Sequence, residues 1–519
     1  LFWTITHIAK RMLVKEGEEI ETWKYIAVMG AGFVGAMGFT FTDSFWFSAV
    51  EAEVYASSSF FTAIVVWAIF RWENVANENY SNRWLVLIAF LMGLSIGVHL
   101  LNLLAIPAIV FVYYFKKYEI SVKAIEGFFI LAVVPFLILL AIPSPGVVTI
   151  LLLALIGLLL WHFYSKKLYK QTGFKKLVQA TIVSMAILIG IMYVIIPYTV
   201  KAASWFELLF VNSFGMGYNS GMIFYCFFIS LVVAALTYWT FKKKKILLNT
   251  IMLCVMVILL GYSAVIMIVI RSNANPPLDE NNPENAFSLL AYLNREQYGD
   301  RPLFYGQYYN APIDRADPYK EGDPNYLQLN GRYEIADHKM SYNYDPEFCT
   351  VFPRMWSPQR DHVSAYKSWG EIKGRPIQIT DNQGKPKTEY RPTFSENLRY
   401  FWRYQVGFMY FRYFMWNFSG RQNDIQGHGG ILKGNWITGI DAIDKMIIGP
   451  QKNLPESMKK NKGTNKYYMI PLLLGVMGMV YTYMRARQDF LFVMLLFFFT
   501  GIAIVLYLNQ YPYQPRERD

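Results

Sequence analysis

Cysteine is scarce in this chain, and so are the patterns that bind metals or nucleotides. Three cysteines occur among 519 residues, too few for a disulfide framework, and Cys226 and Cys254 lie within apolar runs. Histidine and cysteine spacing gives no zinc pattern, and the glycines lack phosphate-loop spacing. Neither a Ser-His-Asp nor a Cys-His arrangement emerges, and no repeat of fixed period is visible. These absences argue against a disulfide-rich, zinc-dependent or ATP-driven protein.

Charged residues are also few, at 17% of the chain against roughly 25% in an average soluble protein. Hydrophobic residues make up 54%, and they gather in runs long enough to span a bilayer as helices. The sequence therefore predicts a mainly α fold, a polytopic transmembrane helical bundle. About eleven membrane spans are expected, near 25–41, 58–71, 84–98, 103–115, 125–141, 146–162, 177–198, 221–241, 246–270, 467–484 and 489–508, several of them shorter than an ideal span.

Lysine and arginine fall on one side of this predicted topology. Twenty of them lie in one alternating set of loops, and three lie in the other short loops and the C-terminal tail. Because Lys and Arg accumulate in cytoplasmic loops, we expect a multi-pass inner (cytoplasmic) membrane protein with residues 271–466 on the periplasmic side. The net charge of +12 then mainly signals orientation in a lipid bilayer, and nucleic acid is not an expected partner.

Three regions follow from this pattern. We expect a transmembrane helical region at 1–270, a periplasmic soluble domain at 271–466, and a transmembrane helical pair with an outer tail at 467–519. Recurrent Pro, Asn and Gly turn signals in the middle region predict a mixed α/β or irregular fold, with a helix near 286–297. The chain starts at Leu1 with what reads as the last turns of a helix and stops without a cap. We therefore expect a fragment, truncated at both ends, of a longer protein.

The first complete outer loop, residues 42–55, carries three acids and no base. Asp43, Glu51 and Glu53 are candidate catalytic carboxylates. Tyr55 is a candidate substrate-binding residue. On a helix, Glu51 and Glu53 would lie about 200° apart, so both would face one site only if the loop is extended there. The alternative is an acidic loop that is solvated and pairs with the polar domain.

A second polar cluster interrupts the apolar stretch 84–115. Ser95, His99 and Asn102 have the spacing of one helix face, and we expect His99 to be catalytic and Asn102 to bind substrate. The alternative is a histidine satisfied within the core. Gly97, His99 and Asn102 also favour two short helices over one long helix, with the polar break facing a cavity rather than lipid.

Aromatic and arginine residues mark the end of the polar region. Eleven of the nineteen residues 400–418 are aromatic, which predicts either an interfacial belt or a platform for sugar rings or a prenyl chain. Arginine forks suit phosphate, so four arginines are candidate substrate-binding residues, with ion pairing that docks the tail as the alternative. They are Arg403, Arg412, Arg516 and Arg518.

Four sets of segments together resemble one family. They are FTDSFW (41–46) with AVEAEVY (49–55), GVHLLN (97–102), YFMWNF (413–418) with GRQND (420–424), and QPRERD (514–519). This set is similar to the protein O-mannosyltransferase-like membrane proteins of Gram-negative bacteria, formerly a domain of unknown function, which have a eukaryotic relative. The resemblance runs over essentially the whole chain.

The resemblance implies a GT-C-type glycosyltransferase whose active site lies at the outer membrane face. Its donor would be a polyprenyl-phosphate-linked sugar, expected to be mannose, and its acceptors would be Ser and Thr hydroxyls of exported proteins. In such families an acid of the first outer loop acts at the catalytic centre. That loop would precede Leu1, which makes Asp43, Glu51 and Glu53 supporting or second acids.

Two other functions fit many membrane spans with a polar outer region. One is a transporter or lipid flippase, which would predict paired half-repeats and broken helices near the midplane. The other is a non-catalytic membrane assembly subunit. No metal ligands are assigned, and a divalent cation stays open as a cofactor because carboxylates could hold one.

Overall fold

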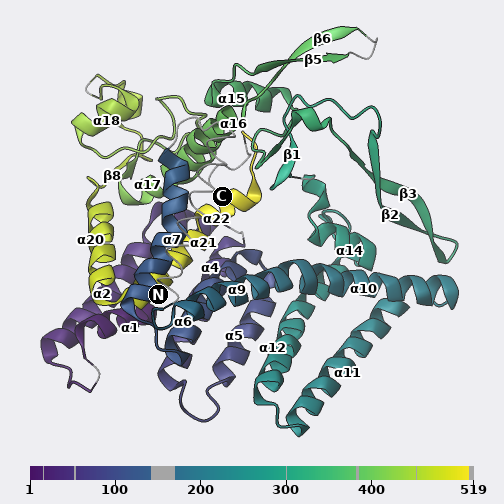
Figure 1. The fold of residues 1–519 in the computed structure, drawn as a ribbon, viewed down its shortest axis with the longest axis horizontal. Helices are drawn as coiled ribbons and strands as arrows, with labels where there is room; N and C mark the ends of the chain where they lie inside the picture. The colour runs from purple at the N-terminus through teal and green to yellow at the C-terminus, as the bar shows by residue number, and fades with distance from the viewer. Residues whose placement is uncertain are drawn as a thin grey trace.

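The computed structural model describes residues 1–513 apart from 16, 52–53, 142–169, 300, 381–384 and 452. All ten expected apolar segments within these residues are helical, and the segment 146–162 lies outside them (Figure 1). The N-terminal helices are α1 (Phe2–Leu13), α2 (Thr22–Thr40), α3 (Asp43–Val50), α4 (Tyr55–Val75), α5 (Arg83–Ile96), η1 (Leu100–Ala105), α6 (Ile106–Lys117) and α7 (Val122–Ala141). They are followed by α9 (Phe174–Ile189), η2 (Gly190–Ile195), α10 (Ile196–Leu208), η3 (Leu209–Ser213), α11 (Ser220–Lys242), α12 (Ile246–Tyr262) and α13 (Ile266–Ser272). After the polar region come α20 (Ile470–Arg485), α21 (Arg487–Phe499) and α22 (Ile502–Leu508).

Five described helical stretches are long and apolar enough to cross a membrane. They are Leu100–Lys117, Phe174–Ser213, Ser220–Lys242, Ile246–Ser272 and Arg487–Leu508. The pair α2 and α3, bent by 65°, would make a sixth, whereas α5 and α20 are apolar but shorter. The described residues thus contain fewer full-length spans than the sequence predicted for them. The fold is therefore that of a mainly α, polytopic membrane protein, as the sequence predicted.

The expected break between two short helices is confirmed: α5 ends at Ile96 and η1 begins at Leu100. Two glycines let α5 pack closely on α12. A Cβ atom on Gly93 would lie 2.4 Å from the Ile258 carbonyl oxygen, and one on Gly261 would lie 2.5 Å from the Leu94 nitrogen. Larger residues at either position would force the two helices apart.

The segment predicted as a span at 177–198 belongs to a longer helix that continues to Ser213 through two π-helical turns. Polar contacts explain the extension. Lys201 pairs with Asp323 at 3.1 Å, and buried Glu207 accepts hydrogen bonds from the Tyr333 hydroxyl at 3.1 Å and from the Met222 N–H at 3.0 Å. The last turns therefore connect the membrane helices to the polar region.

All strands of the described residues lie between Tyr305 and Lys466, in four antiparallel pairs. The pairs are β1 (Tyr305–Gln307) with β4 (Cys349–Val351), β2 (Tyr319–Leu329) with β3 (Arg332–Tyr342), β5 (Arg375–Thr380) with β6 (Pro386–Arg391), and β7 (Gly420–Arg421) with β8 (Asn465–Lys466). The hairpins β2–β3 and β5–β6 project from the body in Figure 1.

Among the helices of this region are α14 (Ala286–Leu293), α15 (Arg360–Gly370), α16 (Phe394–Tyr400), α17 (Arg412–Phe418) and α18 (Asp441–Ile448). The mixed fold predicted for the polar region is thus observed, and α14 begins at the predicted residue because Asn285 forms a capping box with Ser288.

Much of the aromatic segment 400–418 is interior. Between α16 and α17 it forms a π-helical stretch, η7 (Phe401–Phe411), and Tyr400, Tyr404 and Phe408 are buried in a second hydrophobic core with Tyr366. Stacked rings, such as Tyr400 and Tyr404 with centroids 5.3 Å apart, account for this packing. These rings therefore stabilise the polar region rather than forming an open platform.

The end of α22 is held inside the polar region. The Asn509 amide nitrogen donates to the carbonyl oxygens of Pro302 at 2.7 Å and Pro353 at 2.8 Å, and the Arg354 guanidinium donates to the Leu506 carbonyl oxygen at 3.0 Å. Asn509 is fully buried. The last membrane helix and the polar region are thereby joined firmly.

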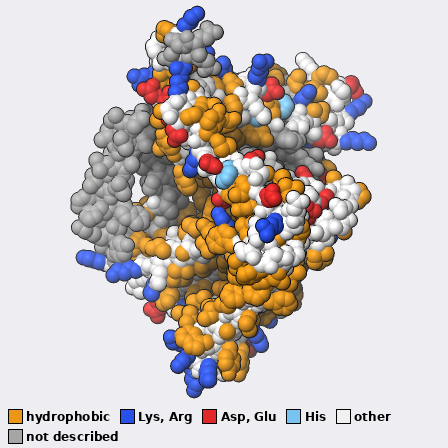
Figure 2. Space-filling view, turned by 90° about the vertical axis from the view of Figure 1, so that its right-hand side faces the viewer, with side chains coloured by type: hydrophobic (Ala, Val, Ile, Leu, Met, Phe, Trp, Pro, Cys, Tyr) orange, Lys and Arg blue, Asp and Glu red, His pale blue; other side chains and the backbone are white. Residues whose placement is uncertain are grey.

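Polar and apolar surfaces divide the molecule. In Figure 2 the lower part is mainly hydrophobic, with Lys and Arg at its lower tip, and side chains of both charges lie above it. We call the side that carries residues 305–466 the domain side, and the opposite side, with Lys242–Lys245, the basic side.

Candidate functional site

Asp43 is the first residue of α3, just after the bend that follows α2. A carboxylate in the first turn of a helix is stabilised by the helix dipole. The Asp43 side chain is 16% exposed, so it is largely enclosed but accessible. The sequence-predicted carboxylate therefore lies at a defined position on the domain side of the helices.

Two residues from the far end of the polar region hold the Asp43 carboxylate. The Asn465 amide nitrogen donates to Asp43 Oδ2 at 2.8 Å, and Arg421 Nε lies 3.9 Å from the same oxygen. Arg421 and Asn465 face each other across the β7–β8 pair. Gly420 permits this pairing, because a Cβ there would lie 2.4 Å from the Asn465 carbonyl oxygen. A two-residue ladder thus presents an amide and a guanidinium to one carboxylate.

Arg421 itself is held in place by its surroundings. Its Nε donates to the Gly463 carbonyl oxygen at 2.9 Å, and its guanidinium lies over the rings of Trp416 at 5.3 Å and Phe47 at 5.7 Å. Arginine is suited to such sites because its planar group can stack on rings while it donates hydrogen bonds. The positive charge beside Asp43 is therefore fixed in orientation.

A second contact fixes the start of α3. The Asn417 side chain accepts from the Ser44 N–H at 3.1 Å and donates to the Ser44 hydroxyl at 2.9 Å. We call Asp43, Ser44, Asn417, Arg421 and Asn465 the Asp43 clasp. It unites two of the four sets of segments on which the family resemblance rests, through FTDSFW, YFMWNF and GRQND. Asn417, Arg421 and Asn465 were not among the site residues predicted from the sequence.

Tyr467 lies beside the clasp, and its pKa depends on the charges there. Burial, followed by the nearby Asp43 carboxylate, raises the pKa of the Tyr467 phenol, while the charge of Arg421 lowers it. Tyr467 is therefore a hydrogen-bond donor across the neutral pH range.

Glu51, near the end of the loop, has an extended backbone rather than a helical one. Helix α3 ends at Val50, Glu51 has ψ 142°, and α4 starts at Tyr55. Of the two conformations considered for this part of the loop, the extended one is therefore observed at Glu51. Glu53 lies outside the described residues, so its role stays a prediction.

His99 lies in the break between α5 and η1, with an extended backbone, rather than on a helix face. Its Nδ1 accepts a hydrogen bond from the Leu101 N–H at 3.2 Å, and the ring centroids of His99 and Tyr55 are 5.7 Å apart. Beneath it, the Asn102 side chain is fully buried and donates to the Ser95 hydroxyl at 3.0 Å. The predicted cluster therefore comes together, with Tyr55 added to it and Asn102 enclosed below.

Of the four predicted phosphate-binding arginines, Arg403 and Arg412 are described, and both have partners within the polar region. Exposed Arg403 pairs with Glu371. Buried Arg412 donates to the carbonyl oxygens of Phe408 at 3.0 Å and Gly434 at 2.9 Å, and so anchors the loop after α17. Arg516 and Arg518 lie outside the described residues. Within the part of the chain that the structure describes, neither Arg403 nor Arg412 forms a hydrogen bond or an ion pair with the Asp43 clasp.

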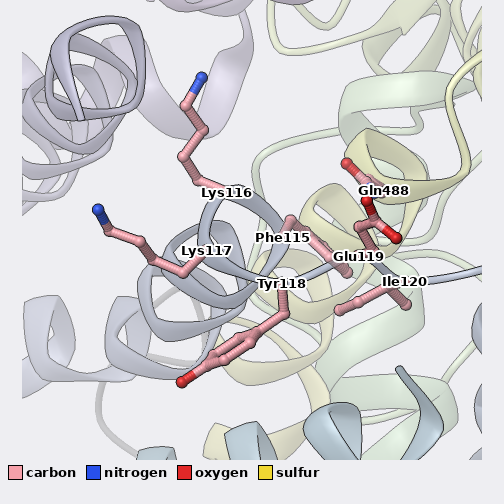
Figure 3. A pocket seen from close by; sticks show the side chains of 7 residues that line it. All are labelled: Phe115, Lys116, Lys117, Tyr118, Glu119, Ile120 and Gln488. Carbon is pink, nitrogen blue, oxygen red and sulfur yellow. The ribbon is translucent and has the colours of Figure 1, made fainter. Parts of the chain in front are cut away.

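Other binding features lie away from the clasp. Among the described residues, no group of three or more His, Cys, Asp or Glu side chains could hold a metal ion. A surface pocket on the basic side is lined by the end of α6, the following residues and Gln488. In Figure 3, Lys116 and Lys117 point away from Glu119 and Gln488 rather than toward a common centre. This pocket therefore offers no convergent set of polar groups.

Two parts of the chain match protein families, and the first part contains both polar clusters of the N-terminal region. Residues 1–122 match the family described as protein O-mannosyl-transferase TMEM260 N-terminal domain. The matched region is O-mannosyltransferase-like. It includes Asp43, Glu51, Tyr55, His99 and Asn102. Residues 299–402 match a family of unknown function, DUF8416. No curated protein and no solved structure matches the chain.

Proposed function

We propose that the chain transfers a sugar, expected to be mannose, from a polyprenyl-phosphate donor to Ser or Thr hydroxyls of exported proteins at the domain side of the membrane. The observation that carries the proposal is the Asp43 clasp, which fixes a carboxylate of the O-mannosyltransferase-like region at the junction of the membrane helices and the polar region. A membrane-bound donor and a soluble acceptor meet at such a junction. In this proposal the domain side is the periplasmic side of the inner membrane.

The reaction requires a base and a stabilised leaving group. The acceptor oxygen forms a bond to the anomeric carbon of the sugar, and the bond from that carbon to the phosphate oxygen breaks. The hydroxyl proton moves to a carboxylate, and the electron pair of the broken bond stays on the phosphate. General-base help of this kind typically contributes about 10²–10⁴-fold.

Although the family resemblance makes Asp43 a supporting acid, we assign the base role to it because it is the carboxylate held in a fixed orientation at this junction. Asn465 and Arg421 both approach Oδ2, so that oxygen is used for orientation and Oδ1 is the oxygen that would accept the proton. Glu51 and Glu53 remain candidates for contacts with the acceptor.

The test uses the full-length protein in membranes with a radiolabelled polyprenyl-phosphate mannose donor. Asp43→Asn should abolish most label transfer to protein, because the amide cannot accept the proton. Asp323→Asn is the control, since Asp323 is an exposed acid on the domain side, in β2, and pairs with Lys201 rather than with the clasp. Equal transfer by wild type and the Asp43 variant would remove Asp43 from the mechanism. Wild-type membranes that incorporate no label above empty membranes would refute the proposed activity.

A further inference from the structure

A loop of the polar region continues directly from the strand that holds the Asp43 clasp. Strand β7 pairs with β8 along one edge. Along its other edge Arg421 forms a β-bridge with Trp436, and the Gln422 N–H donates to the Asn435 carbonyl oxygen at 2.9 Å. Residues 423–434 connect these two segments, and we call them the β7 loop. The loop and the clasp therefore share one strand.

Two buried amide side chains hold the far end of the β7 loop from the inside. The Gln422 amide nitrogen donates to the Ile431 carbonyl oxygen at 2.9 Å, and the Asn423 amide nitrogen donates to the Leu432 carbonyl oxygen at 3.0 Å. The Asn423 side-chain oxygen accepts from the Gly434 N–H at 2.8 Å. Because Asn423 is 2% exposed, these hydrogen bonds are shielded from water. They hold the backbone of the loop in one conformation.

Glycines allow the loop to pack this closely. Gly429 and Gly434 have φ values of 90° and 61°, in the left-handed region that favours glycine. A Cβ atom on Gly427 would lie 2.4 Å from the Lys433 carbonyl oxygen, and one on Gly429 would lie 2.3 Å from the Trp369 ring. The β7 loop is therefore packed against the polar region and against itself.

Apolar side chains stay outside this ordered backbone. Ile431 and Leu432 are each 56% exposed, and Ile425 is 45% exposed. The Ile425 N–H donates to the Asn423 side-chain oxygen at 3.2 Å, so Ile425 and Leu432 are held by the same asparagine. Neighbouring apolar side chains that a rigid backbone keeps exposed add little to folding, and such patches mark interaction sites. We call these three residues the apolar tip.

The apolar tip lies within reach of a polypeptide bound at Asp43. Arg421 Nε lies 3.9 Å from the Asp43 carboxylate, and the next residue, Gln422, is bonded to the loop at Ile431. These contacts limit the distance from the carboxylate to the Ile431 Cα to at most about 23 Å, which about seven residues of extended chain can span. In Figure 1, α18, which follows the loop, lies at the opposite end of the molecule from α11 and α12. A polypeptide therefore reaches the tip more directly than lipid does.

We propose that the β7 loop binds the acceptor polypeptide, with Ile425, Ile431 and Leu432 contacting an apolar segment beside the Ser or Thr that receives the sugar. The inference rests on the proposed sugar transfer and adds a preference to it. Acceptors carry an apolar residue within about seven positions of the hydroxyl. The acceptor is an extended segment rather than a folded surface, because Asp43 is only 16% exposed and a folded surface could not bring a hydroxyl to it.

Peptide binding to the full-length protein in nanodiscs, without any sugar donor, tests the loop. The probe is a fluorescent peptide with one Thr and, about five residues from it, Leu and Val; the reference peptide has Asn at both apolar positions. Ile431→Ser combined with Leu432→Ser should weaken binding of the probe about tenfold, as for the burial of roughly one aliphatic side chain. Binding of the reference peptide and the melting temperature should not change, because the backbone hydrogen bonds of the loop are kept.

The β2–β3 hairpin supplies a matched control. Ile335 and Leu327 are each 54% exposed, and their hairpin lies on the opposite side of Figure 1 from α18. Ile335→Ser combined with Leu327→Ser removes the same two side-chain types and should leave binding of both peptides unchanged.

Photocrosslinking identifies what contacts the loop. A photoreactive benzoylphenylalanine in place of Leu432, in membranes that contain the full-length protein, should form adducts with the probe. Adducts with phospholipid or with a second copy of the chain instead would overturn the proposal.

Two further outcomes of the binding experiment would also overturn it. They are equal affinity of the wild type for the two peptides, and a loss in the loop variant no larger than in the hairpin control. Selective binding of the probe by a protein that transfers no sugar would refute the proposed transferase and leave the peptide-binding loop standing. The failures of the two proposals can thus be told apart.

Discussion

Acidic side chains have different partners on the two sides of the membrane helices. On the basic side, α1, α4 and α21 meet around Arg11, which lies 2.8 Å from Glu73 and 3.3 Å from Asp489. His7 adds a contact to Glu73 at 3.2 Å. On the domain side, Asp43 is held mainly by the neutral amide of Asn465, with the nearest Arg421 nitrogen 3.9 Å away.

This difference separates a structural cluster from a candidate site. Glu73 and Asp489 are nearly inaccessible, so their charges serve to join three helices. Asp43 is oriented by groups on one of its oxygens and keeps some exposure, which is what a carboxylate that must meet a substrate requires. Burial and pairing thus distinguish the two carboxylate environments, although the sequence alone presents all three acids alike.

The largest effect is expected from breaking the cluster on the basic side. Arg11→Met would leave two buried carboxylates without their shared cation, and such a loss typically costs about 3–5 kcal/mol; we expect about 3 because Arg11 is one-third exposed. Thermal unfolding in nanodiscs measures it. Lys460→Met, which removes an exposed pair with Glu456, should cost at most about 1 kcal/mol. A loss in the Arg11 variant no larger than in this control would show that the cluster is not structural.

Removing the Asp43 carboxylate should have the next largest effect, on rate and not on stability. Asp43→Asn is expected to lower the transfer rate about 10²-fold, which corresponds to about 2.7 kcal/mol, while the melting temperature stays close to that of wild type. Single-turnover transfer of labelled mannose provides the rate. If the stability fell as much as the activity, Asp43 would belong with Glu73 as a structural acid.

A smaller effect is expected from Arg421, which acts on Asp43 as a positioning residue. Arg421→Met should lower kcat about tenfold through misplacement of the carboxylate, with KM for the donor unchanged. Arg421→Lys should restore part of the rate, because it returns a positive charge near Asp43 without the stacking between Trp416 and Phe47. A rise in KM with kcat unchanged would instead place Arg421 in substrate binding.

The smallest effect is a dependence of stability on pH at His99. Its pKa is lowered in the folded protein, so the unfolded chain binds the proton more readily. His99 therefore contributes stability above its ordinary pKa of about 6.5, and this contribution is lost as the pH falls below that value. His99→Asn should flatten the change in melting temperature between pH 7 and pH 5. An unchanged slope would mean that other groups produce the pH dependence.

The apolar helices and the break after α5 could be predicted because they follow from local composition. Apolar runs specify helices, and Gly97 with two polar residues interrupts one of them. The clasp could not be predicted in this way, because Asp43 and Asn465 are 422 positions apart. The GRQND motif was a signal, but only the β7–β8 pairing shows that Arg421 and Asn465 reach the same carboxylate.

Other features could not be predicted from local patterns because they depend on contacts with residues distant in the sequence. The helical spacing of Ser95, His99 and Asn102 was real, yet His99 sits in an extended break and takes a Leu101 N–H instead. The long helix continues past 198 because Glu207 finds partners outside the apolar run. The roles of Arg403 and Arg412 depend on Glu371 and Gly434, which no feature of the aromatic segment indicates.

The end of α22 connects the last membrane helix directly to the polar region. Tyr507 lies two residues before Asn509, whose amide is fixed to the chain at Pro302 and Pro353. A shift of the last turn of α22 would therefore be transmitted directly to the strand-bearing region at Pro302 and Pro353.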